Sequence, residues 1–303
     1  GDLDAFEAVL AGGAPIDTPI GNDFSNINHE QSLSNLLSNV ADGGKGQKEA
    51  SRPKWDTPLI VASRLGHINI VRMCLKNGAK NDPFGEGTTA LHAAIAAQQY
   101  DASAVILNSA AKAQADATIC SILDSSGNSP LHIAANIAKK LKKTGEQYTK
   151  SNIIGEYSTS AGDNLQSNDE NKDGGKGSDA QLMELLISHG ADMRQRTSAG
   201  HTALHIATSA GSTSGVECLL EYDDGLIDLV DKNGNTSLHI AVAANDIDVV
   251  RILLQSAANP YIKSIQYKGN AVDIAINKGY SKLGVLLYEY RTYVDENGLK
   301  QTG

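Results

Sequence analysis

The sequence predicts an all-α solenoid, in which helix-turn-helix units stack in a row and the turns between them project as fingers. One observation is a short segment that recurs six times, and its starts are separated by 32, 40, 73, 34 and 34 residues. The other is composition, because 41% of the residues are hydrophobic but only 5% are aromatic. A base period near 33 residues and a small-residue, aliphatic core both favour thin layers of short helices. The segment starts at Thr57, Thr89, Ser129, Thr202, Thr236 and Asn270.

Each recurrence has the features of a helix start followed by two helices. Gly and Asn residues, which tolerate positive φ, precede it, as in 231–235. A Thr or Ser then caps the helix, and Pro or a small residue fills its first position. The first helix is Ala-rich and short, as in 205–210. The second carries apolar residues at helical spacing, including Val250, Leu253 and Leu254, and a Gly-Ala pair such as 190–191 ends it.

These residues resemble the ankyrin repeat, whose signature is Thr-Pro-Leu-His-x-Ala with a closing Leu-Leu-x-x-Gly-Ala-Asp. Residues 185–192 read Leu-Leu-Ile-Ser-His-Gly-Ala-Asp, and the opening signature recurs in phase over most of the chain. The resemblance implies one ankyrin-type domain over 1–303. Its expected parts are a half repeat (1–19), an insertion (20–51), six repeats (52–83, 84–123, 124–196 with a second insertion at 139–177, 197–230, 231–264 and 265–291) and a tail (292–303).

The half repeat and the two insertions depart from a simple array. Residues 1–19 read as a second helix without its first, so we expect a fragment of a longer array. Both insertions are polar and rich in Gly and Asn, and we expect them to be mobile. They are either tolerated surface decoration or partner-specific elements. The basic run 139–143 is either a solvated helix extension or an import or membrane-surface signal.

Charge and cysteine content narrow the expected partners and the compartment. The formal charge is −9, so direct nucleic-acid binding is not expected. The cysteines Cys74, Cys120 and Cys218 are an odd, sparse set that favours reduced thiols over a disulfide framework. We therefore expect a cytoplasmic or nuclear protein. The sequence has no apolar run of about 18 residues, so no membrane insertion is expected.

Four histidines occupy the same repeat position but do not predict a metal site. Stacked layers lie ~10 Å apart, whereas metal–nitrogen bonds are about 2 Å long. We expect each imidazole to tie the turn and the Thr or Ser hydroxyl of its own repeat together. The two Gly-Gly-Lys-Gly runs lack the other residues of a phosphate-binding loop. The sequence thus predicts no catalytic residue, metal or cofactor. The histidines are His92, His132, His205 and His239.

The resemblance implies that a partner meets the fingers and the outer side of the first helices. Trp55 stands where the turn glycine is usual, which makes it either a hot spot or a residue that packs under the first insertion. Lys and Asn dominate the last fingers, a composition that suits an acidic or polar peptide. The expected partner-binding residues are Trp55, Asp56, Arg64, Glu86, Ser126, Asn128, Asn136, His201, Lys232, Asn233, Asn235, Tyr267, Lys268 and Lys278.

Two functions follow from this reading. The first is a protein-interaction scaffold that binds another protein or peptide on this surface and is not an enzyme. The second is a regulatory ankyrin segment of a larger effector, such as a transcription regulator, an enzyme or an ion channel. The long insertions also bear a loose likeness to those of fungal cell-cycle transcription cofactors. A catalytic, channel or DNA-binding segment elsewhere in the same polypeptide would favour the second function.

Overall fold

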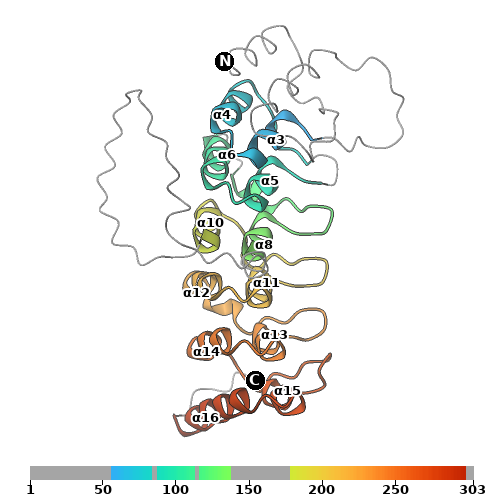
Figure 1. Cartoon of the computed structure of the whole chain (residues 1–303), viewed down its shortest axis with the longest axis vertical. Coiled ribbons are helices and arrows are strands. Elements are labelled where there is room, and N and C mark those ends of the chain that lie inside the picture. The colour runs from blue at the N-terminus through green and yellow to red at the C-terminus, as the bar shows by residue number, and fades with distance from the viewer. Residues whose placement is uncertain (1–55, 84–86, 113–115, 138–177, 298–303) are drawn as a thin grey trace, which may run out of the picture.

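The computed structural model describes residues 56–83, 87–112, 116–137 and 178–297. The helices in these ranges form two parallel rows that run the length of an elongated stack (Figure 1). The all-α solenoid is confirmed, and the described residues contain one isolated bridge, Ser264 to Gly269, and no extended strand. The first helices of the repeats are α3 (Pro58–Leu65), α5 (Ala90–Ala96), α8 (Pro130–Ala135), α11 (Ala203–Ala210), α13 (Ser237–Ala243) and α15 (Ala271–Asn277).

The second helices form the other row and are longer on average. Two short elements lie outside the paired pattern, namely α7 (Asp116–Ser121) and the 3-10 turn η3 (Asp224–Leu226). The α7 helix falls in the predicted repeat 84–123, whose segment starts 40 residues before the next one. The second helices are α4 (Ile68–Lys76), α6 (Tyr100–Lys112), α10 (Ser178–Ser188), α12 (Thr213–Tyr222), α14 (Ile247–Gln255) and α16 (Ser281–Asn297).

The repeated Thr and His start the first helices through a reciprocal cap. In α5, the hydroxyl of Thr89 accepts a hydrogen bond from the backbone N–H of His92 at 3.3 Å. The His92 ring returns it, because Nδ1 accepts from the backbone N–H of Thr89 at 3.3 Å. The same capping box starts α8, α11 and α13, and in α15 an Asn270–Asp273 pair replaces it. The predicted role of the four histidines within their own repeat is therefore confirmed.

The core is aliphatic, as the composition predicts. The signature leucine of each first helix is at most 1% exposed, from Leu59 to Leu238. Full burial of such a side chain stabilises the fold by roughly 1.5–3 kcal/mol. The three cysteines are also buried, and none of them forms a disulfide.

Some predicted parts of the chain differ from the structure or lie beyond what it describes. The final helix continues to Asn297, so it runs past the predicted repeat boundary at 291. The α8 helix ends at Ala135 and α10 begins at Ser178, on either side of the predicted insertion 139–177. That insertion, the half repeat 1–19 and the insertion 20–51 lie outside the described residues.

Candidate functional site

The fingers, at 124–128, 197–201, 231–235 and 264–269, project from the stack beside the first helices (Figure 1). Two of them are organised by an aspartate that acts as a hub. Asp231 Oδ1 accepts hydrogen bonds from the backbone N–H groups of Asn233 and Asn235, both at 2.8 Å. Asp124 does the same two fingers earlier, with the backbone N–H groups of Ser126 and Asn128 as donors at 2.9 and 2.8 Å. The tips therefore project from turns whose backbone is fixed from within.

A left-handed glycine lets each finger lie against the backbone of the next. A Cβ added to Gly200, whose φ is +83°, would lie 2.9 Å from the backbone nitrogen of Lys232. The equivalent Cβ at Gly234 would lie 3.1 Å from the nitrogen of Ile265. The Lys232 N–H also donates to the carbonyl of Ala199 at 3.3 Å. Close contact of this kind joins the fingers into a continuous row.

The aligned histidines also reach across to the following finger, a role that sequence reasoning missed. Nε2 of His205 lies 3.0 Å from the carbonyl oxygen of Asn235, and Nε2 of His239 lies 2.9 Å from that of Ile262. Because Nδ1 accepts from the backbone within the repeat, Nε2 carries the proton and donates. Burial lowers the pKa of His205 to about 4, and burial also lowers the pKa of the other three. Those three are His92, His132 and His239.

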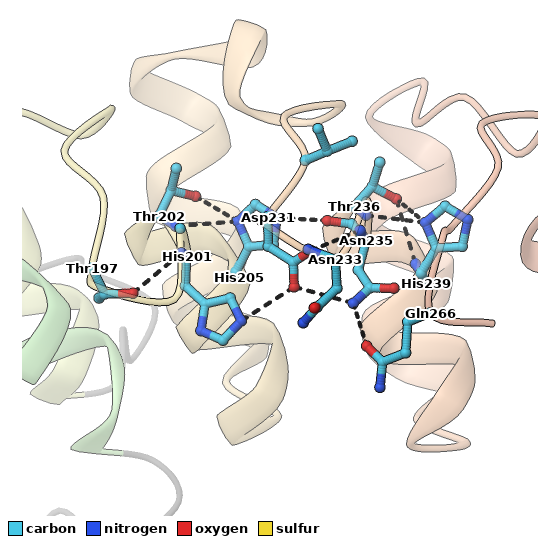
Figure 2. Close-up of polar contacts among 12 residues, drawn as sticks. Thr197, His201, Thr202, His205, Asp231, Asn233, Asn235, Thr236, His239 and Gln266 are labelled. Carbon is cyan, nitrogen blue, oxygen red and sulfur yellow. Dashed lines mark hydrogen bonds and ion pairs between the residues drawn. The ribbon is translucent and has the colours of Figure 1, made fainter. Parts of the chain in front are cut away.

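A polar network centred on the buried residues Asp231, Asn235 and Ser264 crosses three repeats at the base of the later fingers (Figure 2). His201 Nε2 lies 3.3 Å from Asp231 Oδ2, and the side-chain amide of Asn235 donates to the same carboxylate at 3.1 Å. That amide also donates to Gln266 at 2.6 Å, while the Ser264 hydroxyl donates to the amide oxygen at 2.6 Å. Burial favours the neutral form of Asp231, but hydrogen bonds from Asn235 and Asn233 hold its pKa below the usual range.

Asn235 is the one predicted partner-binding residue that the structure moves to the interior. Its exposed fraction is 3%, because its side chain closes the network between Asp231, Gln266 and Ser264. The structure therefore places Asn235 inside the stack and not on the predicted binding surface.

The other predicted residues fall into three groups. Asp56 and Arg64 pair with each other at 2.6 Å on the first described repeat. Trp55 and Glu86 lie outside the described residues. The structure places the remainder on the finger tips or at the ends of first helices, exposed or half-buried: Ser126, Asn128, Asn136, His201, Lys232, Asn233, Tyr267, Lys268 and Lys278.

A lysine and two aromatic rings meet where the last finger lies beside the C-terminal end of α15. The ammonium group of Lys278 donates to the carbonyl oxygen of Ala243 at 2.9 Å. It also lies 6.0 Å from the ring centroid of Tyr267 and 5.9 Å from that of Tyr280. Cation–π attraction at this distance contributes about 0.5–1 kcal/mol at an exposed site. Two predicted residues, Tyr267 and Lys278, are thus brought together.

A small hollow lies at the first helices α5, α8 and α11, next to the finger row. Its volume is about 90 Å³, and both apolar side chains and amides line it. Asn128 and Asn136 were predicted, whereas Ile133 and Ile206 were not. Those two follow the signature histidine directly, so their shared position in the repeat was the available signal. The lining residues are Ala96, Asn128, His132, Ile133, Asn136, Ile137 and Ile206.

This surface is suited to binding more clearly than to chemistry. Among the residues that the structure describes, no three His, Cys, Asp or Glu side chains come together as metal ligands. Nor does any helix in the described ranges have the length and apolar character needed to cross a membrane. The exposed groups are amides, hydroxyls and lysines that stand on a fixed backbone.

The chain is similar in sequence and in structure to known ankyrin-repeat proteins. The sequence profile for ankyrin repeats, described as three repeat copies, matches residues 25–119 and 175–264. A solved structure of the Bcl-3 ankyrin repeat domain superposes with a TM-score of 0.58 at 22% identity, covering 78% of this chain and 86% of that one. The ankyrin repeat protein EF0377 gives a TM-score of 0.57 at 19% identity, covering 77% of this chain and 97% of that one.

Two curated relatives match over about a third of the chain. One is a transient receptor potential cation channel subfamily A member 1 homolog of Caenorhabditis elegans, 30% identical over 99 residues, which are 33% of this chain and 8% of the relative. The other is the E3 ubiquitin-protein ligase KEG of Arabidopsis thaliana, 35% identical over 102 residues, which are 34% of this chain and 6% of the relative. In each case the matched part is less than a tenth of the relative's length.

Proposed function

Because this chain belongs to the ankyrin-repeat family, whose repeats generally serve as protein-interaction modules, we propose that it binds a partner protein along its finger row and first helices. The observation that carries the proposal is the continuous row of fingers. Successive fingers are fixed to one another through their backbones, so their tips keep a constant spacing without a partner. A surface ordered before binding loses less conformational entropy when a partner docks.

The exposed groups favour an extended polar segment as the bound part of the partner. Asn136 is exposed at the hollow, where its amide can meet a peptide backbone while Ile133 and Ile206 contact an apolar side chain. The later fingers add exposed lysines, Lys232 and Lys268, to a chain whose formal charge is −9. Opposite charge on the partner would therefore set its orientation and raise its association rate.

A capture experiment with matched variants tests the proposal. Lys232→Glu and Asn233→Ala, combined, change two exposed tips without touching the buried network. Glu217→Ala and Arg251→Ala, combined, make a control on the second helices, where both side chains are exposed. We expect the finger variant to lose a specific partner and the control to retain it. Equal recovery of every partner by both variants would refute binding at the fingers.

A second candidate is a regulatory segment within a larger effector. The match to short stretches of a channel homolog and of an E3 ubiquitin ligase supports it, since both are far longer than this chain. The distinguishing observation is the complete polypeptide from which the sequence comes. An attached channel, ligase or DNA-binding region that responds to finger variants would establish regulation, whereas indifference to those variants would leave the scaffold function.

A cytoplasmic or nuclear location remains part of the proposal. The three buried cysteines support it, because cysteines that form no disulfide suit a reducing compartment. Fractionation of cells that express the tagged chain, with reporters for each compartment, would test this directly. Recovery in the secretory pathway would contradict it.

A further inference from the structure

The last helix pair, α15 and α16, exposes apolar groups at positions that every earlier repeat buries against its neighbour. Ile276 of α15 occupies the position of Val242 in α13 and Ile95 in α5. Those two side chains are 0% exposed, whereas Ile276 is 68% exposed. An array normally ends in a repeat with a polar outer face. The outer face of this last described pair instead presents Ile276 and Tyr288, beside the exposed polar residues Asp273 and Ser281.

The second helix of the pair shows the same contrast. Tyr288 of α16 stands where Leu254 of α14 is 3% exposed, but Tyr288 is 62% exposed. Between Tyr288 and the start of the helix lies Gly284, at the position where α14 has the fully buried Val250. A Cβ added to Gly284 would have no atom within 4 Å. The end face, defined here as Ile276, Gly284 and Tyr288, therefore has a notch one helical turn from a protruding ring.

The last finger argues against a further ankyrin layer on this face. Each earlier described finger has a left-handed glycine two residues before the helix cap, as at Gly200 and Gly234. The next finger approaches that glycine so closely that a Cβ would lie 2.9–3.2 Å from its backbone nitrogen. In the last finger this position is Lys268, with φ +55°. Its Cβ occupies the place that a following finger would need.

We propose that the end face binds a second copy of the same chain, with the two α16 helices packed antiparallel. In this arrangement Tyr288 of each copy fills the Gly284 notch of the other, and the two Ile276 side chains border the contact. A two-fold interface requires a self-complementary patch, and a ring and a notch one turn apart on one helix provide it.

Sedimentation equilibrium of the 303-residue chain across the micromolar range tests the proposal. We expect a monomer–dimer equilibrium that Tyr288→Lys weakens by about tenfold or more, as for a central interface anchor. Gly284→Val should weaken it equally, because valine fills the notch while the open space around Gly284 leaves the monomer undisturbed. Tyr222→Lys is the control, since Tyr222 is 51% exposed on a different layer. Circular dichroism confirms that each variant keeps its helix content.

Cysteine cross-linking tests the register and the symmetry. Oxidation of a mixture of Gly284→Cys and Tyr288→Cys chains should give a covalent heterodimer, with far less product from either variant alone. The native thiols are buried and do not compete. A chain that stays monomeric throughout, a dimer that tolerates both α16 variants, or growth into open polymers would each overturn the proposal.

Discussion

Acidification from pH 7 to pH 5 should destabilise the stack, because the four signature histidines are buried in their neutral form. His205 is neutral in the folded chain, because burial lowers its pKa from 6.5 to about 4. Its Nδ1 accepts from the backbone N–H of Thr202 at 3.2 Å, and its Nε2 donates to the carbonyl of Asn235 at 3.0 Å. A proton on Nδ1 would abolish the first bond and place a charge in the core. Folding therefore requires the neutral ring.

The sign and size follow from proton linkage. Between pH 4 and pH 6.5 the unfolded chain binds more protons than the folded chain, so stability rises with pH in that window. The stability that the neutral ring contributes is fully present above pH 6.5 and is lost as the pH falls toward 4. For His205 alone, the loss at pH 5 is about 2 kcal/mol. Burial raises the pKa of Asp228, which acts in the opposite direction and offsets part of the loss.

Urea unfolding followed by circular dichroism at pH 7, 6 and 5 measures the effect. The midpoint should fall at each step, and His205→Gln should reduce the slope with pH because it removes one titrating ring. NMR titration of the folded chain should show the His205 ring neutral at pH 5. A midpoint that rises on acidification, or an equal slope in His205→Gln, would refute the reasoning.

Three further changes test other parts of the account. Gly200→Ala should cost more than about 1 kcal/mol, because it combines positive φ with a clash against the next finger, and urea midpoints would show it. Asn235→Ala should cost about 1–3 kcal/mol, since the network partners lose a buried donor and acceptor; a midpoint equal to wild type would contradict the network. Cys74, Cys120 and Cys218 should react with a thiol reagent only as the chain unfolds, so rapid labelling of native protein would contradict their burial.

The fold was predictable from the sequence because the repeat encodes it locally. Each Thr and His pair, such as Thr89 and His92, specifies a helix start within four residues. Leucine and alanine at fixed spacing then specify which faces stack. Where the local code changes, as at the Asn270–Asp273 pair, the same cap forms from other side chains.

The site was less predictable because burial depends on the neighbouring repeat. Asn235 belongs to a finger and is polar, yet Ser264 and Gln266 from the next finger enclose it. Those partners are about 30 residues away, beyond the reach of a pattern within one repeat. The hydrogen bond from each histidine Nε2 to the next finger was not predicted, for the same reason. The exposed tips, such as Lys232 and Asn233, were easier to predict because these residues stay exposed in the assembled stack.

Site-specific photo-crosslinking tests binding at the finger row most directly. A photoreactive amino acid is placed at Asn233 on a finger tip, or at Glu217 on a second helix, in chains expressed in cells. We expect the Asn233 chain to form a discrete covalent adduct with a protein partner and the Glu217 chain to form none. An adduct from Glu217 alone would place the partner on the opposite row of helices and contradict the proposed surface.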